Sequence, residues 1–297
     1  MKRREFIGSA LATASLTAMP GMLSAGTDHS DGKILRTGHI GVGSQGRHHL
    51  GNMIKLPGFE IRTLCDVLPF QMNAAMKMVG PGTDAVTDYR RILDDPEIDA
   101  VVIATPFNFH AQPMIDALDA GKHVYCEKTL VKGFDQIEQT AGAVAHSDRI
   151  VQAGYQHRYS KHLREVAALI RSGHIGSISK VECQWNRSTD WRRPVPSPDY
   201  ERAVNWRMYR EYSGGLAAEL SSHQMDILEW VMDTRPQQVM GTGGIDYWKD
   251  GRETRDNISL LVRYENGVTA SFTCLTTNKS GGFRMTFLGT EGTIVTS

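Results

Sequence analysis

The sequence predicts an α/β protein with a doubly wound parallel sheet in its N-terminal half and a C-terminal α+β domain built on an open, mostly antiparallel sheet. Three observations carry this prediction. Residues 33–155 alternate apolar, strand-like runs with helical patterns, and a glycine-rich turn follows the first run. After residue 155, strand-like runs follow one another with few helices between them. Strands that alternate with helices are typical of parallel sheets, whereas successive strands joined by turns are typical of antiparallel ones.

Length and composition indicate an ordinary globular protein whose function depends on a local site. The chain has 297 residues, enough for two domains, and is 40% apolar and 22% charged. Lys plus Arg and Asp plus Glu both total 33, so the formal net charge is zero. Because there is neither a net field nor a basic run, nucleic acid and anionic membranes are not expected partners. After the N-terminal segment, no stretch is long and apolar enough to span a bilayer.

Residues 1–25 predict a twin-arginine-type signal peptide. The segment has a basic start, a modest apolar run rich in small residues, and a small-residue cleavage point near Ala25. Arg3 and Arg4, followed by Phe6 and Ile7, resemble that signal. An amphipathic N-terminal helix of the mature fold is the alternative. We therefore expect a periplasmic or otherwise exported protein, and the four scattered cysteines, which form no disulfide framework, fit folding before export.

Residues 33–155 are expected to form the first domain. Its strand-like runs are 33–43, 59–67, 98–105, 122–128 and 149–155, and helical patterns cover 110–122 and 134–146. The regular alternation indicates parallel strands joined by crossover helices on both sheet faces.

The first strand-like run ends in the turn GVGSQG. Gly41, Gly43 and Gly46 have the G-x-G-x-x-G spacing, with Ser44 and Gln45 between them. The three glycines allow a tight turn, the approach of backbone N–H groups to a pyrophosphate, and packing of the next helix on the sheet. Asp66, 20 residues after Gly46, ends the second strand, where a carboxylate accepts hydrogen bonds from the adenosine ribose. With no Arg after Asp66, these features predict a Rossmann domain for NAD rather than NADP; the alternative is a glycine turn and a surface Asp.

Two further strand ends are expected to line the same crevice, because ligands of open parallel sheets bind outside the carboxyl ends of strands. Thr105, Asn108 and His110 follow the third strand and should lie along the cofactor, although His110 could equally cap or pack the next helix. Glu127 and Lys128 end the fourth strand beside the nicotinamide. The Lys128 ammonium can hold a substrate hydroxyl and stabilise its alkoxide, and Glu127 could orient Lys128 or contact the nicotinamide ribose.

Several motifs together resemble the glucose-fructose oxidoreductase, inositol dehydrogenase and rhizopine-catabolism (Gfo/Idh/MocA) family of NAD(P)-dependent sugar oxidoreductases. They are GVGSQG, CDV, ATPFNFHA, DAGKHVYCEK and, later, SGG with SHQMD, and the resemblance runs from about residue 33 to the end of the chain. In that family the lysine that Lys128 matches is catalytic and is normally followed by proline. Here Thr129 follows, so no cis bend is expected after Lys128, because a non-proline cis peptide bond costs about 3 kcal/mol.

Residues 156–297 are expected to form the substrate-binding domain, which resembles the family's open sheet. A helix is predicted over 162–176, and strand-like runs cover 177–185, 237–248, 258–277 and 283–297. The chain stops within a strand-like run, whereas family members usually continue, so a fragment or an abbreviated C-terminal domain is expected.

A helix predicted over 214–233 carries a polar stripe. Glu219, His223 and Asp226 recur at i, i+4 and i+7 and share one face. The resemblance implies that His223 removes the proton of the substrate hydroxyl, and that Glu219 stands where many members have Asp. The residues alone leave two alternatives, a solvated stripe or a metal site of Glu219 and His223 with His157; spacing shows no further ligand, so no metal is expected.

Residues 186–215 combine tryptophans, tyrosines, arginines and prolines, which suit a sugar with its C–H faces and hydroxyls. The expected substrate contacts are Arg158, Tyr159, Trp206, Arg207 and Asp226. The alternative for residues 186–215 is a proline-rich surface loop packed by its own tryptophans.

These features predict an NAD-dependent oxidoreductase that oxidises a hydroxyl of a sugar, a glycoside or a cyclitol. His223 would take the proton and Lys128 would stabilise the alkoxide. Because no free NAD pool is expected outside the cytoplasm, NAD would be loaded before export and held tightly. Two alternatives remain open: an NAD-dependent redox glycosidase, in which transient oxidation at C3 and elimination give net hydrolysis, and a non-catalytic NAD-binding protein. The expected partner is a small carbohydrate, and homo-oligomerisation is left open.

Overall fold

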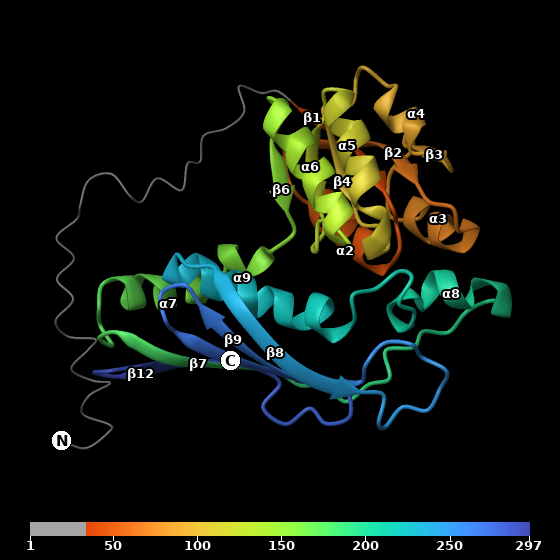
Figure 1. The fold of residues 1–297 in the computed structure, drawn as a ribbon. Coiled ribbons are helices and arrows are strands. Elements are labelled where there is room, and N and C mark those ends of the chain that lie inside the picture. Colours follow the sequence, from red (N-terminus) through yellow and green to blue (C-terminus); the bar gives the residue numbers. More distant parts are fainter. Residues whose placement is uncertain (1–33) are drawn as a thin grey trace. The chain divides into compact units, whose positions relative to one another are not determined.

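The first of two sheets is formed by parallel strands early in the chain (Figure 1). The computed structural model describes residues 34–297, so the signal peptide expected over residues 1–25 lies outside the described residues. The strand order is β3-β2-β1-β4-β5-β6, and every neighbouring pair is parallel. The strands are β1 (Leu35–Ile40), β2 (Phe59–Cys65), β3 (Asp84–Val86), β4 (Ala100–Ile103), β5 (His123–Cys126) and β6 (Val151–Ala153). Because β1 lies between β2 and β4, the direction of the crossovers reverses there, which opens a crevice at the strand ends.

Helices cover both faces of this sheet. They are α2 (Ser44–Met53), α3 (Pro69–Met76), α4 (Arg90–Leu93), α5 (Ala111–Asp119) and α6 (Phe134–His146). Leu64 packs with Leu50 of α2 and Ala75 of α3, whereas the next residue, Cys65, packs in a separate cluster with Met114 of α5. Neighbouring strand residues point to opposite faces, so the expected doubly wound Rossmann sheet is confirmed.

Strand β3 and helix α4 were not expected from the sequence. They have only 3 and 4 residues. An alternation of apolar and polar side chains cannot be recognised over so few positions.

The second sheet is mostly antiparallel, as expected, with the order β12-β11-β7-β10-β9-β8. Its strands are β7 (Ile178–Trp185), β8 (Pro236–Gly244), β9 (Asn257–Tyr264), β10 (Thr269–Leu275), β11 (Phe283–Gly289) and β12 (Thr293–Thr296). One pair, β7 with β10, is parallel. Helices α7 (Lys161–Arg171) and α9 (Ser222–Met232) pack on one face of the sheet (Figure 1), where Ile227 and Val231 of α9 meet Phe272 and Phe287. Helix α8 (Glu201–Val204) lies in the long connection after β7.

The helix expected over residues 214–233 begins with a π-helical turn, Ala217–Ser221, ahead of α9. The backbone N–H of Ser222 donates to the carbonyl oxygen of Ala217, five residues earlier. A π-turn is wider than an α-turn and often occurs at functional sites. None of the helices within residues 34–297 combines the length and apolar character that crossing a bilayer requires.

Candidate active site

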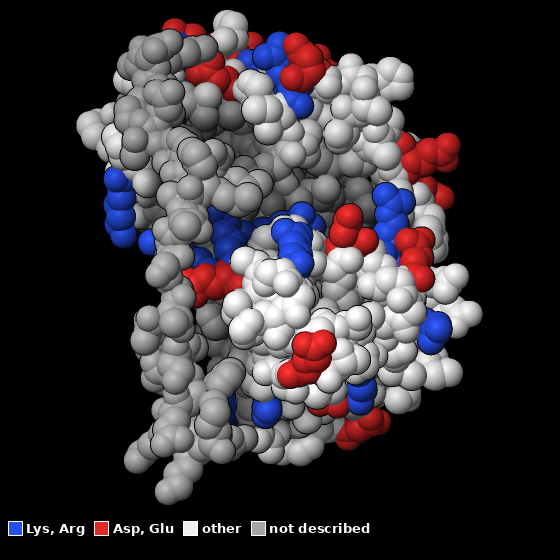
Figure 2. Space-filling view, turned by 90° about the vertical axis from the view of Figure 1, so that its left-hand side faces the viewer, with Lys and Arg blue, Asp and Glu red and all other residues white. Residues whose placement is uncertain are grey.

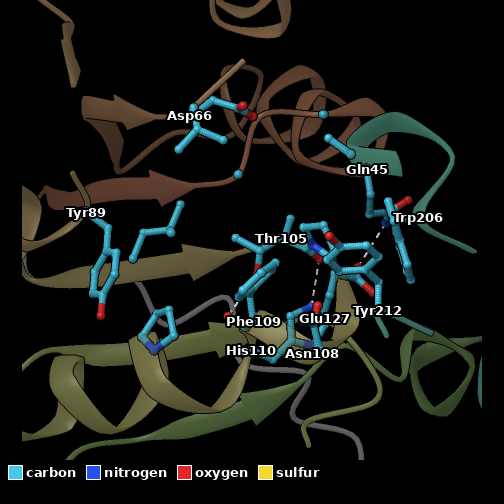
Figure 3. A pocket seen from close by; sticks show the side chains of 18 of the residues that line it. Gln45, Asp66, Tyr89, Thr105, Asn108, Phe109, His110, Glu127, Trp206 and Tyr212 are labelled. Atoms are coloured by element: carbon cyan, nitrogen blue, oxygen red, sulfur yellow. Dashed lines mark hydrogen bonds between the residues drawn. The ribbon is translucent and has the colours of Figure 1, made fainter. Parts of the chain in front are cut away.

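A cavity of about 720 Å³ lies at the strand ends of the parallel sheet and is also lined by residues of the second half of the chain. Figure 3 shows side chains that line it, among them Gln45, Asp66, Thr105, Glu127 and Trp206. Of the residues predicted to belong to the site, fourteen are found in the wall of this cavity: Gly41, Gly43, Ser44, Gln45, Asp66, Thr105, Asn108, His110, Glu127, Lys128, Trp206, Arg207, Glu219 and His223. The two halves of the chain therefore contribute to one cavity.

The glycine turn has the geometry that its spacing predicts. Gly41 has a φ of +87°, in the left-handed region that favours glycine. A Cβ atom at Gly46 would lie 2.1 Å from the carbonyl oxygen of Gly41, so only glycine lets α2 pack this closely. A Cβ atom at Gly43 would meet no protein atom within 4 Å, and Gly43 lines the cavity. Space for a phosphate group therefore lies beside Gly43, at the N-terminal end of α2.

Two alanine substitutions should separate folding from cofactor binding. Gly46→Ala is expected to lower the melting temperature, because its Cβ overlaps the Gly41 backbone. Gly43→Ala should melt like the wild type and bind NAD more weakly, because its methyl group projects into open space in the cavity wall. Thermal melting and NAD titration of both variants test this. Equal loss of stability in both would show that the turn is only structural.

Asp66 lies at the end of β2, as the sequence predicts for a ribose ligand (Figure 3). Its two carboxylate oxygens accept hydrogen bonds from the backbone N–H groups of Val42 and Leu68, each at 2.8 Å. Burial raises the pKa of Asp66 although these bonds oppose the shift. Each oxygen has a further lone pair for a ribose hydroxyl. The open space at Gly43 and this carboxylate therefore fit an adenine dinucleotide.

Glu127 is held by helix α2 rather than by the Lys128 side chain. His49 Nε2 lies 2.7 Å from Glu127 Oε1, and Gln45 Nε2 donates to the same oxygen at 2.9 Å. Burial raises the pKa of Glu127, but the bonds and charges of its neighbours, His49 first, lower it by more, so the carboxylate stays ionised. Gly154 permits this arrangement, because a Cβ atom there would lie 3.0 Å from Glu127 Cα. The site thus contains a fixed carboxylate at the end of β5.

Lys128 reaches the π-turn of the second half of the chain. Its Nζ donates to the carbonyl oxygen of Glu219 at 3.1 Å and lies 3.7 Å from Glu219 Oε2. Arg207 Nε donates to that same carboxylate oxygen at 2.9 Å. Burial raises the pKa of Glu219, but the charges of Lys128 and Arg207 lower it by more, so Glu219 is an anion between two cations. Glu219 thus orients Lys128 and Arg207 at the cavity wall.

The peptide bond between Lys128 and Thr129 is cis, which corrects the expectation that no cis bend follows Lys128. That expectation used only the intrinsic preference of a non-proline pair, whereas surrounding groups hold this peptide. His110 Nδ1 lies 2.8 Å from the carbonyl oxygen of Thr129, and His110 Nε2 lies 2.9 Å from that of Thr105. Burial lowers the pKa of His110 although both bonds oppose the shift. His110 lines the cavity, but its two ring nitrogens face the backbone carbonyl oxygens of Thr129 and Thr105, of which the neutral ring can donate to one; this favours the packing role left open for it.

His223 lies in the cavity wall with no hydrogen bond from either ring nitrogen to any residue within 34–297, and its Nδ1 is buried. The rings of Tyr155, His157 and Trp185 surround it at centroid distances of 5.7, 5.2 and 5.4 Å. Burial and, next, the charge of Lys128 lower its pKa to about 3. His223 is therefore a neutral imidazole with an available lone pair.

Four of the expected site residues do not line the cavity: Gly46, Arg158, Tyr159 and Asp226. Gly46 is buried under Gly41, and Tyr159 is 60% exposed. Arg158 and Asp226 form a bidentate ion pair, with Nη2 to Oδ1 at 2.6 Å and Nε to Oδ2 at 2.9 Å. Asp226 therefore does not join Glu219 and His223 in the cavity wall. Among residues 34–297, no group of three or more His, Cys, Asp or Glu side chains is arranged to hold a metal ion. This applies also to Glu219, His223 and His157, the set for which a metal site was the alternative.

Three residues with functional positions were not expected. His49 holds Glu127, Tyr155 packs against His223, and Arg193 lines the cavity. The spacing of Gln45 and His49, i and i+4 after the glycine turn, could have indicated that both face Glu127. Arg193 carried no such signal.

Charges of both signs occur side by side on the face drawn in Figure 2, with no broad patch of one sign. This agrees with the zero formal charge of the chain.

Comparison with known proteins identifies both halves of the chain. A model described as "Oxidoreductase family, NAD-binding Rossmann fold" matches residues 35–155, and the "GFO/IDH/MocA C-terminal domain" model matches residues 163–295. Myo-inositol 2-dehydrogenase of Thermotoga maritima is 25% identical over 78% of this chain and 66% of its own length. Levoglucosan dehydrogenase of Pseudarthrobacter phenanthrenivorans is 25% identical over 88% of this chain and 73% of its own length.

The fold matches that of solved structures. Scyllo-inositol dehydrogenase from Lactobacillus casei, solved with NAD(H) and scyllo-inositol, superimposes with a TM-score of 0.76 at 23% identity, over 89% of this chain and 76% of that one. The chain spans about half to two thirds of the length of several curated relatives it matches, 54% in one case and 66% in two.

Proposed function

We propose that this chain, which belongs to the Gfo/Idh/MocA family of oxidoreductases, oxidises a secondary hydroxyl group of a cyclitol or a sugar with NAD. The observation that carries the proposal is the convergence of Lys128, Glu219 and His223 on the cavity that the glycine turn also lines. Relatives that act on an inositol and on levoglucosan support the substrate class.

The glycine turn and two carboxylates would hold NAD. Gly43 and Ser44 offer space and backbone donors for the phosphates, and Asp66 offers acceptors to the adenosine ribose. Glu127, fixed by His49 and Gln45, would accept from the nicotinamide ribose. When bound, NAD supplies the two-electron acceptor that this oxidation needs.

Lys128 would bind the hydroxyl that reacts. Its Nζ lies 3.7 Å from the Glu219 carboxylate, and its bond to the Glu219 carbonyl oxygen fixes where Nζ lies. A cation at this position stabilises negative charge as it grows on the substrate oxygen.

His223 would take the proton of that hydroxyl at one of its ring nitrogens. The ring is neutral, buried and without a hydrogen bond to the described chain, so its lone pair is free for the substrate. Trp206 and Arg207, which also line the cavity, would position the ring of the substrate.

A substrate panel tests the proposal. The full chain is incubated with NAD and, separately, myo-inositol, scyllo-inositol, glucose and levoglucosan, and NADH is followed by absorbance. At least one of these should give NADH in proportion to product. Release of phenol from a chromogenic glycoside over many turnovers, without NADH accumulation, would instead identify a redox glycosidase. Absence of both reactions, with NAD bound, would indicate a non-catalytic NAD-binding protein.

A further inference from the structure

Segment 186–215, which connects β7 to the π-turn, lies against the NAD-binding half of the chain. The ring of Tyr200 meets that of Phe70 in α3 edge to face, with 5.1 Å between centroids. The carbonyl oxygen of Tyr212 accepts a hydrogen bond from the backbone N–H of Asn108 at 3.3 Å. Segment 186–215 therefore contacts two of the elements that border the cavity.

Segment 186–215 adds two cations to the cavity wall, Arg207, which pairs with Glu219, and Arg193. The backbone of Arg193 is held on both sides by one buried side chain. Its N–H donates to Asn205 Oδ1 at 2.7 Å, and its carbonyl oxygen accepts from Asn205 Nδ2 at 3.1 Å. The side chain of Asn205 thus fixes the backbone of Arg193 within the segment.

The guanidinium of Arg193 forms no hydrogen bond or ion pair with any residue of 34–297, whereas that of the preceding Arg192 binds Asp250 and Glu201. Burial, and then the charges of Arg207 and Arg47, lower the pKa of Arg193. A partly buried cation among other cations is unfavourable unless it finds an anion. Negative charge on a bound ligand would therefore be stabilised at Arg193.

The position of Arg47 indicates which anion fits. Its Nη1 donates to the carbonyl oxygen of Val42, inside the glycine turn, at 2.9 Å. Arg193 lines the same cavity as Gly41, Gly43 and Ser44 of that turn. The turn and the N-terminus of α2 are where the diphosphate of a dinucleotide binds. The diphosphate is also the anionic part of NAD.

We propose that Arg193 binds the diphosphate of NAD, so that segment 186–215 clamps the cofactor onto the glycine turn and slows its release. The proposal rests on the NAD binding assigned above and adds a residue from the other half of the chain. It gives segment 186–215 a role besides sugar binding.

Binding measurements on the full chain test the clamp. Dissociation constants for NAD, ADP-ribose and adenosine are measured for the wild type and for Arg193→Gln and Arg193→Lys, together with the rate of NAD loss. Arg193→Gln should weaken NAD and ADP-ribose by about 10- to 100-fold, the value of a charge-assisted hydrogen bond, and leave adenosine unchanged. Arg193→Lys should recover part of this affinity, because it keeps the charge without the planar fork.

Arg202→Gln is the matched control. Arg202 belongs to the same segment and pairs with Glu211, but does not line the cavity. It should bind NAD like the wild type, and all variants should melt like the wild type. Unchanged NAD affinity in Arg193→Gln, an equal loss for adenosine, or an equal loss in Arg202→Gln would reject the clamp. A chain that shows the Arg193 effect but oxidises no cyclitol or sugar would reject the reaction and leave the clamp standing.

Discussion

Replacing Lys128 with Met is expected to lower kcat by a factor of about 10³ or more while NAD binding persists. The ammonium lies 3.1 Å from the Glu219 carbonyl oxygen and 3.7 Å from the Glu219 carboxylate, and we assign it to the charge that grows on the substrate oxygen. Removal should leave the fold intact, because Arg207 still pairs with Glu219 at 2.9 Å. Steady-state kinetics on the best substrate of the panel, with an NAD titration alongside, measure both effects.

Lys161→Met is the control for this substitution. Lys161 is exposed at the start of α7 and does not line the cavity. It should have the kinetics of the wild type. Undiminished kcat in Lys128→Met would remove Lys128 from the mechanism.

His223→Asn is expected to lower kcat about 10²- to 10⁴-fold, the usual contribution of a positioned proton acceptor. An amide is a similar size but cannot take up a proton at neutral pH. His157→Gln is the matched control, because His157 packs against His223 at 5.2 Å but does not line the cavity. If both variants lose activity equally, the aromatic cluster rather than proton transfer explains the loss.

The pH profile of the wild type gives a second test of His223. A base with a pKa of about 3 stays neutral until the pH approaches 3, so lowering the pH from 8 to 5 should not remove it. The pH dependence of kcat/KM reports the ionisable groups of the free enzyme. Protonation of His223 should therefore cause no fall in kcat/KM between pH 8 and pH 5. A histidine of ordinary pKa, about 6.5, would instead be half protonated at pH 6.5. A single-proton loss of kcat/KM centred there, absent from His223→Asn, would contradict the lowered pKa of His223 and leave its role as proton acceptor standing.

Much of the fold could be predicted because it depends on local patterns. The alternation of strands and helices predicted the parallel sheet, and the spacing of Gly41, Gly43 and Gly46 predicted a turn in which Gly46 packs against Gly41. Strand β3 was not predicted, because its 3 residues are too few to show the alternation of apolar and polar side chains that marks a strand.

The candidate site was predicted only in part, because helical spacing assumes a regular helix. Glu219, His223 and Asp226 share a face on an ideal α-helix, but the π-turn at Ala217–Ser221 precedes α9, and Asp226 pairs with Arg158. The cis peptide after Lys128 likewise departs from the preference of its residue pair. In both places tertiary contacts outweigh local tendency.

By itself the sequence determined the two kinds of sheet, the dinucleotide turn and the strand end that presents Lys128, since each is encoded by neighbouring residues. Only the tertiary structure decided that Lys128 meets Glu219, 91 positions along the chain, and that Arg193 lines the cavity without an acidic partner among residues 34–297. Such pairings depend on how distant elements pack, and spacing along the chain does not specify which side chains then share one low-dielectric space.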